Sequence, residues 1–295
     1  MIINHNMNAM NAHRQMGVNN TNNGKAIEKL SSGLRINRAG DDAAGLSISE
    51  KMRGQIRGLD QASRNSQDGI SLIQTAEGAT NETHNILQRM RELAVQSSNG
   101  TNITEDRDQI QKEFTQLTQE INRIASQTMF NKQNLLDTAS NAVKFQVGAN
   151  ADQTITVTLQ DMSVNAIGIG GASAVATVMS TDGSTVKTPG VPATTGAKVD
   201  TQTAASAAIT AIDTAIQNVS SFRADLGSVQ NRLESAIRST DNSSENLQAA
   251  ESRIRDVDMA KEMMNFSKTN ILSQAAQAML SQANQQPQGV LQLLR

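Results

Sequence analysis

Two long stretches of this chain lack proline and repeat apolar residues at intervals of three and four, the spacing of one helix face. The first covers residues 43–98 and the second covers residues 204–260. At about 1.5 Å per residue, the first stretch alone predicts a rod roughly 80 Å long. A shorter stretch with the same pattern follows Thr104, which we expect to be its N-cap. The fold should therefore be mainly α, a long antiparallel helical bundle or coiled coil.

Between these stretches the pattern changes to that of a β-hairpin. Residues 143–147 and 155–159 alternate apolar and polar side chains, and the segment between them suits a hairpin loop. The next stretch, 161–203, is rich in Gly, Ala, Ser and Thr and holds two of the three prolines. This composition is typical of a loop or a small irregular excursion rather than a second full domain.

The order of these patterns divides the chain into five parts and returns its end to its beginning. We expect the terminal helices to pair with each other as a coiled coil when the protein assembles. The parts, in order, are a terminal helix and connector at 1–42, the first part of a helical core domain at 43–160 with a hairpin at about 143–159, a short variable insert at 161–203, a returning long helix at 204–260, and a C-terminal helix at 261–295.

Both ends of the chain carry almost no charge. No Asp, Glu, Lys or Arg occurs in residues 1–13 or 269–294, where aliphatic residues are mixed with Asn, Gln, Ser and Ala. A transmembrane helix needs about 20 predominantly apolar residues, and the polar run 284–288 excludes one here. A soluble monomer normally distributes charge over its exposed helices. We therefore expect other protein to cover these ends in an assembly.

Two thin end helices bury too little surface to be stable alone. Ordering a residue costs about 1–2 kcal/mol of backbone entropy, whereas burial returns only about 25 cal/mol per Å² of apolar surface. We therefore expect the ends to be frayed in the monomer and to fold on assembly. The expected contact residues are the large apolar side chains of both ends: Met7, Met10, Ile27, Leu30, Leu34, Met264, Ile271, Leu272 and Met279.

Composition argues against catalysis. The chain has no Cys, so disulfides, thiolate metal sites and a Cys nucleophile are excluded. His5, His13 and His84 fit no metal-binding motif, and neither a Walker loop nor a G-x-S-x-G motif occurs. Asp41 and Asp42 fit a loop and a helix N-cap better than a paired-carboxylate site. We expect no enzyme activity, no cofactor and no metal.

Charge and the N-terminal sequence limit the partners and the location. The net charge of −2 gives no bulk attraction to nucleic acid or anionic lipid. The N-terminus has neither the basic segment nor the long apolar segment of a conventional secretory signal. The protein is therefore expected either in the cytoplasm or on an export route that cleaves no signal.

Several long motifs resemble those of bacterial flagellins and occur in the same order. They include IEKLSSGLRIN at 27–37 followed by DDAAG at 41–45, QASRN at 61–65, LQRMRELAVQ at 87–96, SRIRDVDMA at 252–260 and VLQLLR at 290–295. The resemblance covers about residues 1–160 and 205–295. The short insert implies a thin filament with at most a small outer bump, because large flagellins carry outer domains at this point.

The resemblance implies a structural subunit that self-assembles into the helical flagellar filament for swimming. It implies export in the unfolded state and polymerisation at the filament tip, outside the cell. The implied partners are further copies of the chain, an export chaperone that binds the C-terminal region, the filament cap and the hook–filament junction proteins. No nucleic acid and no membrane insertion are expected.

The resemblance also implies recognition by host innate immune receptors. The patch read by the Toll-like receptor for flagellin corresponds to Arg89, Leu93 and Glu113, although a helix pattern alone would make Arg89 part of a solvated face. The C-terminal leucines read by the cytosolic inflammasome sensor correspond to Leu291, Leu293 and Leu294.

Two other interpretations compete with a filament subunit. A hook–filament junction protein resembles flagellin at both ends and would form a short junction instead of a long filament. A secreted adhesin or membrane-active helical protein would use its amphipathic ends differently. Membrane-active helices usually carry Lys and Arg on the polar face, and residues 269–294 contain neither.

Overall fold

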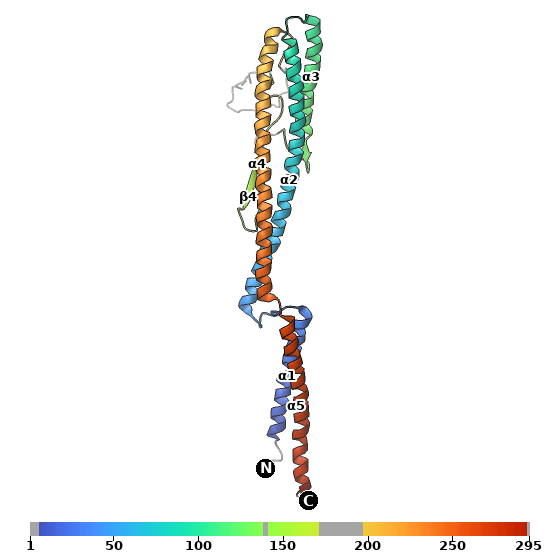
Figure 1. Ribbon diagram of the computed structural model, residues 1–295, viewed down its shortest axis with the longest axis vertical. Helices are drawn as coiled ribbons and strands as arrows, with labels where there is room; N and C mark the ends of the chain where they lie inside the picture. Colours follow the sequence, from blue (N-terminus) through green and yellow to red (C-terminus); the bar gives the residue numbers. More distant parts are fainter. Residues whose placement is uncertain (1–5, 138–140, 171–196, 294–295) are drawn as a thin grey trace, which may run out of the picture. The chain divides into compact units, whose positions relative to one another are not determined.

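The computed structural model describes residues 6–137, 141–170 and 197–293 (Figure 1). Its elements, in chain order, are α1 (Met7–Ser32), α2 (Ala43–Ser97), α3 (Thr104–Gln127), β1 (Met129–Phe130), β2 (Gln133–Asn134), β3 (Asn141–Gln146), β4 (Thr154–Leu159), α4 (Gln202–Arg255) and α5 (Met259–Leu293). The chain divides into a terminal unit, residues 1–57 with 243–295, and a core unit, residues 58–242. Each unit contains part of α2 and part of α4.

The predicted fold class is confirmed: long helices dominate, and β3 and β4 pair as an antiparallel hairpin. The predicted N-cap of α3 is wrong by one residue, because the helix already begins at Thr104 and Ile103 is its N-cap. The carboxylate of Asp106 accepts the backbone N–H of Ile103 at 3.4 Å, which is the contribution of the third helical residue to a capping box.

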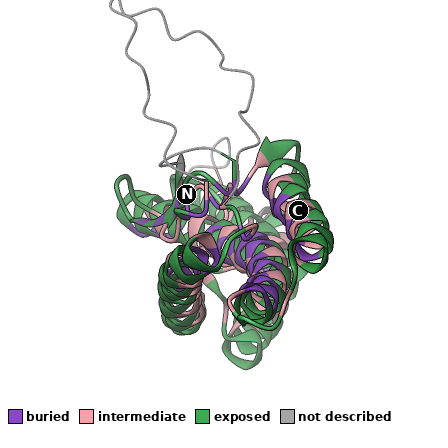
Figure 2. Ribbon diagram, turned by 90° about the horizontal axis from the view of Figure 1, so that it is seen from above, coloured by how far each residue is buried: buried purple, intermediate pink, exposed green. Residues whose placement is uncertain are grey.

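The apolar faces of α2, α3 and α4 meet inside the core unit. Phe114 of α3 and Phe222 of α4 are the largest side chains that are fully buried there. Strand β4 turns every second side chain inward, as a half-buried strand does. Figure 2 shows the buried residues on the sides of helices that face their neighbours. A continuous apolar cluster therefore holds the three helices and the hairpin together.

A glycine lets the hairpin lie close to α2. A Cβ atom on Gly69 would come within 3.2 Å of the Phe145 ring and within 3.3 Å of the Leu233 side chain. Nearby, the side-chain amide of Asn65 donates to the backbone carbonyl of Gln146 at 3.3 Å. Because Gly69 has no side chain, the Phe145 ring of β3 can approach α2 closely.

The described edges of the 161–203 stretch belong to the core, where the sequence predicted only a loop. Met162, Val164, Ile167, Ile169 and Val199 are all buried. Polar side chains of α3 make this possible by accepting backbone N–H groups that would otherwise be unpaired. The acceptors are Asn122 for Val164, at 3.1 Å, and Gln111 for Val199, at 2.6 Å. Residues 171–196 lie outside the described part of the chain.

A second small hairpin, β1 with β2, has no counterpart in the sequence predictions. Its two turn residues, Asn131 and Lys132, have positive φ angles of 48° and 64°. Positive φ at both central positions is the signature of a type I′ turn, which matches the twist of a two-residue hairpin.

In the terminal unit, the segment that follows α1 forms backbone hydrogen bonds with the segment between α4 and α5. Helix α1 stops where Gly33 adopts the left-handed conformation at φ 71°, as a helix C-cap often does. The backbone N–H of Arg35 donates to the Arg255 carbonyl at 2.6 Å, and that of Val257 donates to the Gly33 carbonyl at 3.0 Å. Asp42 then caps α2 by accepting the N–H of Gly45 at 2.8 Å. Two segments far apart in sequence are thereby joined.

Candidate assembly surface

The buried part of the contact between α1 and α5 consists of small and polar side chains. On α1, the buried residues are Asn19 and Ala26. On α5, Ser273, Ala276 and Ala283 are buried. No large apolar side chain is among the buried residues that the structure describes on either helix. Small side chains let two helix backbones approach closely, but they remove little apolar surface from water.

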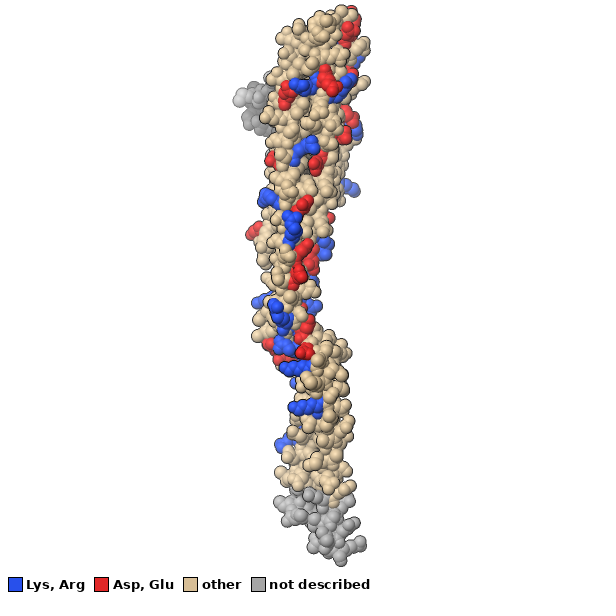
Figure 3. Space-filling model, viewed as in Figure 1, with Lys and Arg blue, Asp and Glu red and all other residues tan. Residues whose placement is uncertain are grey.

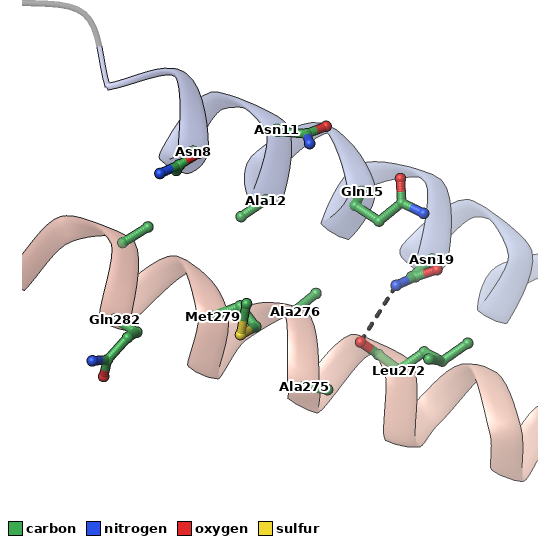
Figure 4. Close-up of a pocket in the computed structure, with 11 residues that line it drawn as sticks. Asn8, Asn11, Ala12, Gln15, Asn19, Leu272, Ala275, Ala276, Met279 and Gln282 are labelled. Carbon is green, nitrogen blue, oxygen red and sulfur yellow. Dashed lines mark hydrogen bonds between the residues drawn. The ribbon is translucent and has the colours of Figure 1, made fainter. Parts of the chain in front are cut away.

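Hydrogen bonds supplement this thin contact (Figure 4). The side-chain amide of Asn19 donates to the Leu272 carbonyl at 3.3 Å, as the dashed line shows. The Ser273 hydroxyl donates to the Asn20 side-chain oxygen at 3.0 Å. Near the chain end, the Asn6 amide donates to the Ala283 carbonyl at 2.7 Å. Polar groups thus determine which faces of α1 and α5 meet.

Several large apolar side chains lie on the opposite sides of these two helices, whereas Met16, Leu30, Phe266 and Leu280 are half-buried on the facing sides. Ser273 follows Met264 by nine residues, which is two and a half turns at about 3.6 residues per turn, so the two side chains point in opposite directions. Asn19 follows Met10 by the same interval. Ile271 and Met279 follow Met264 at steps of seven and eight and share its side. Met264, Ile271 and Met279 are 67%, 65% and 65% exposed.

We call these exposed apolar residues the outer face of the α1·α5 pair. It contains seven of the nine side chains predicted to make assembly contacts, while Leu30 and Leu34 are half-buried. The sequence predictions missed further members, since large apolar residues at helical spacing could equally have faced the partner helix. The outer face consists of Met7, Met10, Val18 and Ile27 on α1 and Met259, Met263, Met264, Ile271, Leu272 and Met279 on α5.

The surface of the pair is hollowed at several points. Met263, Met264 and Ile271 line one hollow together with Leu272, Ser267 and Lys268. A second hollow, next to Met7 and Met10, reaches Leu280 of α5. A third, of about 710 Å³, runs along the seam of the two helices and is drawn in Figure 4 with its Asn and Gln side chains. Such relief offers places into which side chains of another molecule can insert.

Charge is sparse over this pair. On the side that Figure 3 shows, red and blue side chains recur along α2, α3 and α4, whereas tan atoms cover most of α1 and α5. The few charged residues of α1 are Arg14, Lys25, Glu28 and Lys29. On α5 the last charged residue among those described is Lys268. The outer face therefore causes little electrostatic repulsion of another copy of itself.

The receptor residues predicted from the resemblance differ in how far their side chains are exposed. Arg89 donates to Glu113 at 2.9 Å and to Glu92 at 3.0 Å, and all three side chains are exposed. The hydrogen bonds that it donates to Glu92 and Glu113 raise the pKa of the Arg89 guanidinium, so it stays charged. Leu93 instead lies in the core with 2% exposure. Of the predicted patch, only Arg89 and Glu113 meet at the surface.

The predicted inflammasome-sensor residues cannot be placed in the same way. Leu291 and Leu293 belong to the helical backbone of α5, but their side chains are outside the described residues, as is the whole of Leu294. In the part of the chain that the structure describes, no three His, Asp or Glu side chains gather as a metal site would require. Among the same residues, no helix has the length and apolar content of a membrane span.

Known proteins match this chain over its full length. The chain is 61% identical to a flagellin of Halalkalibacterium halodurans over 295 residues, and 56% identical to a flagellin of Bacillus subtilis over 311 aligned positions. In both comparisons the match covers 100% of each protein.

A solved structure resembles the fold at low sequence identity. It is a putative flagellar hook-associated protein from Vibrio parahaemolyticus, with a TM-score of 0.55, 11% identity, and coverage of 73% of this chain and 100% of that one. At this identity the likeness shows the fold alone.

Two family models match by sequence: the bacterial flagellin N-terminal helical region at residues 3–141 and the bacterial flagellin C-terminal helical region at residues 209–294. The chain therefore belongs to the bacterial flagellins, the structural subunits of the flagellar filament.

Proposed function

We propose that this chain polymerises into the filament through the outer face of its α1·α5 pair. One observation carries the proposal: the residues that α1 and α5 bury are all small or polar, while ten of their large apolar side chains are exposed. Contiguous exposed apolar surface of this kind marks an interaction site in soluble proteins. Residues 269–294 carry no charge, so covering this part of α5 leaves no ion without water or a partner.

The energies favour a polymer over an isolated helix pair. Fully covering one Ile, Leu or Met side chain is worth about 1.5–3 kcal/mol. Association of two proteins costs about 4–15 kcal/mol in lost freedom of motion. Several outer-face side chains per subunit are therefore enough to offset that cost. On this proposal the end helices become stable only when neighbouring subunits cover them.

The same weakness of the helix pair supports export in an unfolded state. A chain whose ends gain their stability from neighbours is easy to keep unfolded until it reaches the growing tip. Before export, a chaperone that binds the C-terminal region would cover Met264, Ile271 and Met279 and prevent early polymerisation. At the tip, a cap would hold the subunit while its ends fold. The mature location is then the extracellular filament, reached through the hook and its junction proteins.

Seeded polymerisation tests the proposal. Short filament fragments of the wild-type protein serve as seeds, and sedimentation and negative-stain microscopy follow extension by wild type and by Ile271→Asp. We expect wild type to form long filaments and Ile271→Asp to form none, since a carboxylate on the outer face loses its water when covered. Gln119→Asp adds the same charge on the exposed side of α3 and should extend the seeds as wild type does.

Two results would count against the proposal. Normal extension by Ile271→Asp would show that the outer face of α5 is not an assembly contact. Short rings or stubs from the wild type, under conditions that extend seeds of a known flagellin, would favour the hook–filament junction protein instead.

We also propose that Arg89 and Glu113 form part of a surface that a host Toll-like receptor reads on the monomer. The support is their exposure and the hydrogen bonds that fix the guanidinium between two carboxylates. A reporter assay should lose signal with Arg89→Ala combined with Glu113→Ala, and keep it with Arg123→Ala, an exposed arginine further along α3. Signalling at wild-type strength by the double variant would refute this part. Recognition of Leu291, Leu293 and Leu294 by the inflammasome sensor stays a prediction from the resemblance.

A further inference from the structure

Among the described methionines, the most exposed ones and the fully buried ones belong to different parts of the protein. The chain has 13 methionines, and seven of them belong to α1 or α5. Met7, Met10, Met264 and Met279 are each at least 60% exposed. In the core unit, Met90 and Met162 are buried with at most 2% exposure. The polarisable thioethers that water and small solutes can reach are thus concentrated on the outer face.

We propose that oxidation of Met7, Met10, Met264 and Met279 by a peroxide blocks polymerisation, and that reduction of the sulfoxides restores it. This inference rests on the proposed role of the outer face in assembly. It assigns a chemical modification site to that face and a means of regulation that needs no unfolding of the core unit.

The reaction is a two-electron oxidation of sulfur. The thioether attacks one oxygen of hydrogen peroxide, the O–O bond breaks, an S–O bond forms, and the second oxygen leaves as water. Sulfur loses two electrons and the peroxide gains them. Methionine sulfoxide reductases reverse the step. Because the chain contains no Cys, no thiol of this protein competes for the oxidant.

The position of these side chains explains why oxidation would act on assembly. A sulfoxide turns a flexible apolar side chain into a polar one, and a polar group that is covered without a hydrogen-bond partner is unfavourable. The contact between α1 and α5 buries Asn19, Ala26, Ser273, Ala276 and Ala283 and no methionine among the described residues. Oxidation of the four exposed methionines therefore changes the surface offered to a neighbouring subunit and leaves the pairing of the two helices unaltered.

The polymer and the free subunit should also differ in reactivity. In a filament built through the outer face, the neighbouring subunit covers these four sulfurs and excludes the peroxide. In the free subunit they are open to solvent. The effect would therefore fall on subunits that have not yet been added, while finished filaments persist.

Met129 provides a matched control within the same chain. It is 50% exposed, lies in β1 of the core unit, and is not part of the outer face. Peroxide should oxidise Met129 readily, yet a Met129→Leu variant should respond to peroxide as wild type does. Met90 and Met162 should stay unoxidised in the folded protein because solvent does not reach their sulfurs.

The experiment treats full-length monomer with hydrogen peroxide, removes the oxidant, and measures extension of untreated wild-type seeds. Peptide mass spectrometry reports the oxidised fraction at each methionine. We expect wild type and Met129→Leu to extend at a rate lowered about tenfold or more, as sulfoxides that must be covered would require. A variant with Leu at positions 7, 10, 259, 263, 264 and 279, which removes every methionine of the outer face, should keep its own untreated rate. Sulfoxide reductases A and B should restore wild-type extension.

The outcomes separate this inference from the proposal beneath it. Failure of untreated wild type to extend seeds would remove the proposed assembly role itself. Unchanged extension by wild type with Met264 and Met279 shown to be oxidised would refute the redox inference and leave assembly intact. Loss of extension by the peroxide-treated six-Leu variant would refute it as well, by placing the sensitive group outside the outer face. Equal oxidation of Met264 in filaments and in monomers would contradict the expected protection.

Discussion

The core unit and the α1·α5 pair are both built from amphipathic helices, but they direct their large side chains oppositely. In the core unit, Phe114, Phe222 and Leu87 point into a shared interior and are fully buried. In the pair, Met264, Ile271 and Met279 point away from the partner helix and are exposed. The first arrangement completes a fold within one chain. On the proposed function, the second leaves the fold to be completed by other chains.

The same comparison explains where charge occurs. The surface of the core unit carries ion pairs between helices, such as Arg91 of α2 with Asp213 of α4 at 2.6 Å. Their side chains are about half exposed and remain in water. The α5 surface beyond Lys268 has no such pairs, because it has no charged residues in the described part of the helix. A surface that other subunits will cover is better without ions, since each would have to be desolvated.

The largest predicted difference between the two regions concerns stability of the monomer. Phe114→Ala removes a fully buried ring, and we expect it to lower the free energy of unfolding of the core unit by about 3–5 kcal/mol. Ile271→Ala removes an exposed side chain and should change the same quantity by about 0.5 kcal/mol or less. Urea denaturation followed by circular dichroism measures both. Comparable losses from the two variants would mean that the monomer buries Ile271, contrary to the comparison.

The sequence predicted the helices well because periodicity reports which residues share a helix face. The 3-and-4 pattern at 43–98 corresponds to α2, Ala43–Ser97, almost to the residue. Periodicity does not report what covers that face. The large residues of α5 could have packed on α1, and only the three-dimensional arrangement shows that Ser273 and Ala276 do so instead. Steps of three and seven among Ser273, Ala276 and Ala283 were the available signal.

Contacts distant in sequence account for the other misses. The burial of Val164 and Val199 depends on Asn122 and Gln111, which are 42 and 88 residues away. No local pattern contains that information. Leu93 illustrates the same limit for the predicted receptor patch. Its helix motif places it near Arg89, but tertiary packing buries it and leaves Arg89 at the surface.

A smaller predicted effect probes the close contact of α1 with α5. Ala276 is buried against α1, whereas Ala278, two residues further along α5, is exposed. Ala276→Leu adds volume where the helices touch, and such overpacking costs about 1–3 kcal/mol. Ala278→Leu has nearly the same helix propensity and no such cost. In assembled filaments, hydrogen exchange of α1 amides should accelerate in the first variant only. Equal protection in both would show that α1 and α5 are not in close contact at Ala276.

The smallest effect concerns the connector of the terminal unit and depends on pH. The carboxylate of Asp41 accepts the backbone N–H groups of Arg38 at 3.0 Å and of Asn37 at 3.2 Å. These bonds, Arg38 first, lower the pKa of Asp41, with smaller contributions from the charges of Lys29 and Lys25. Because the pKa is lower in the folded state, the stabilisation is complete above the ordinary Asp pKa of about 3.9 and is lost as pH falls below it.

Asp41→Asn should therefore resemble the acid form of the wild type at every pH. At neutral pH, we expect weaker protection of the amides of residues 37 and 38 in the variant than in the wild type, relative to the intrinsic exchange rate. Near pH 3 the two proteins should converge. Protection in the core unit should stay equal in both, since no charged side chain is buried among its described residues. A difference between the two proteins that persists or grows in acid would show that the amide group at position 41, rather than the lost charge, is responsible.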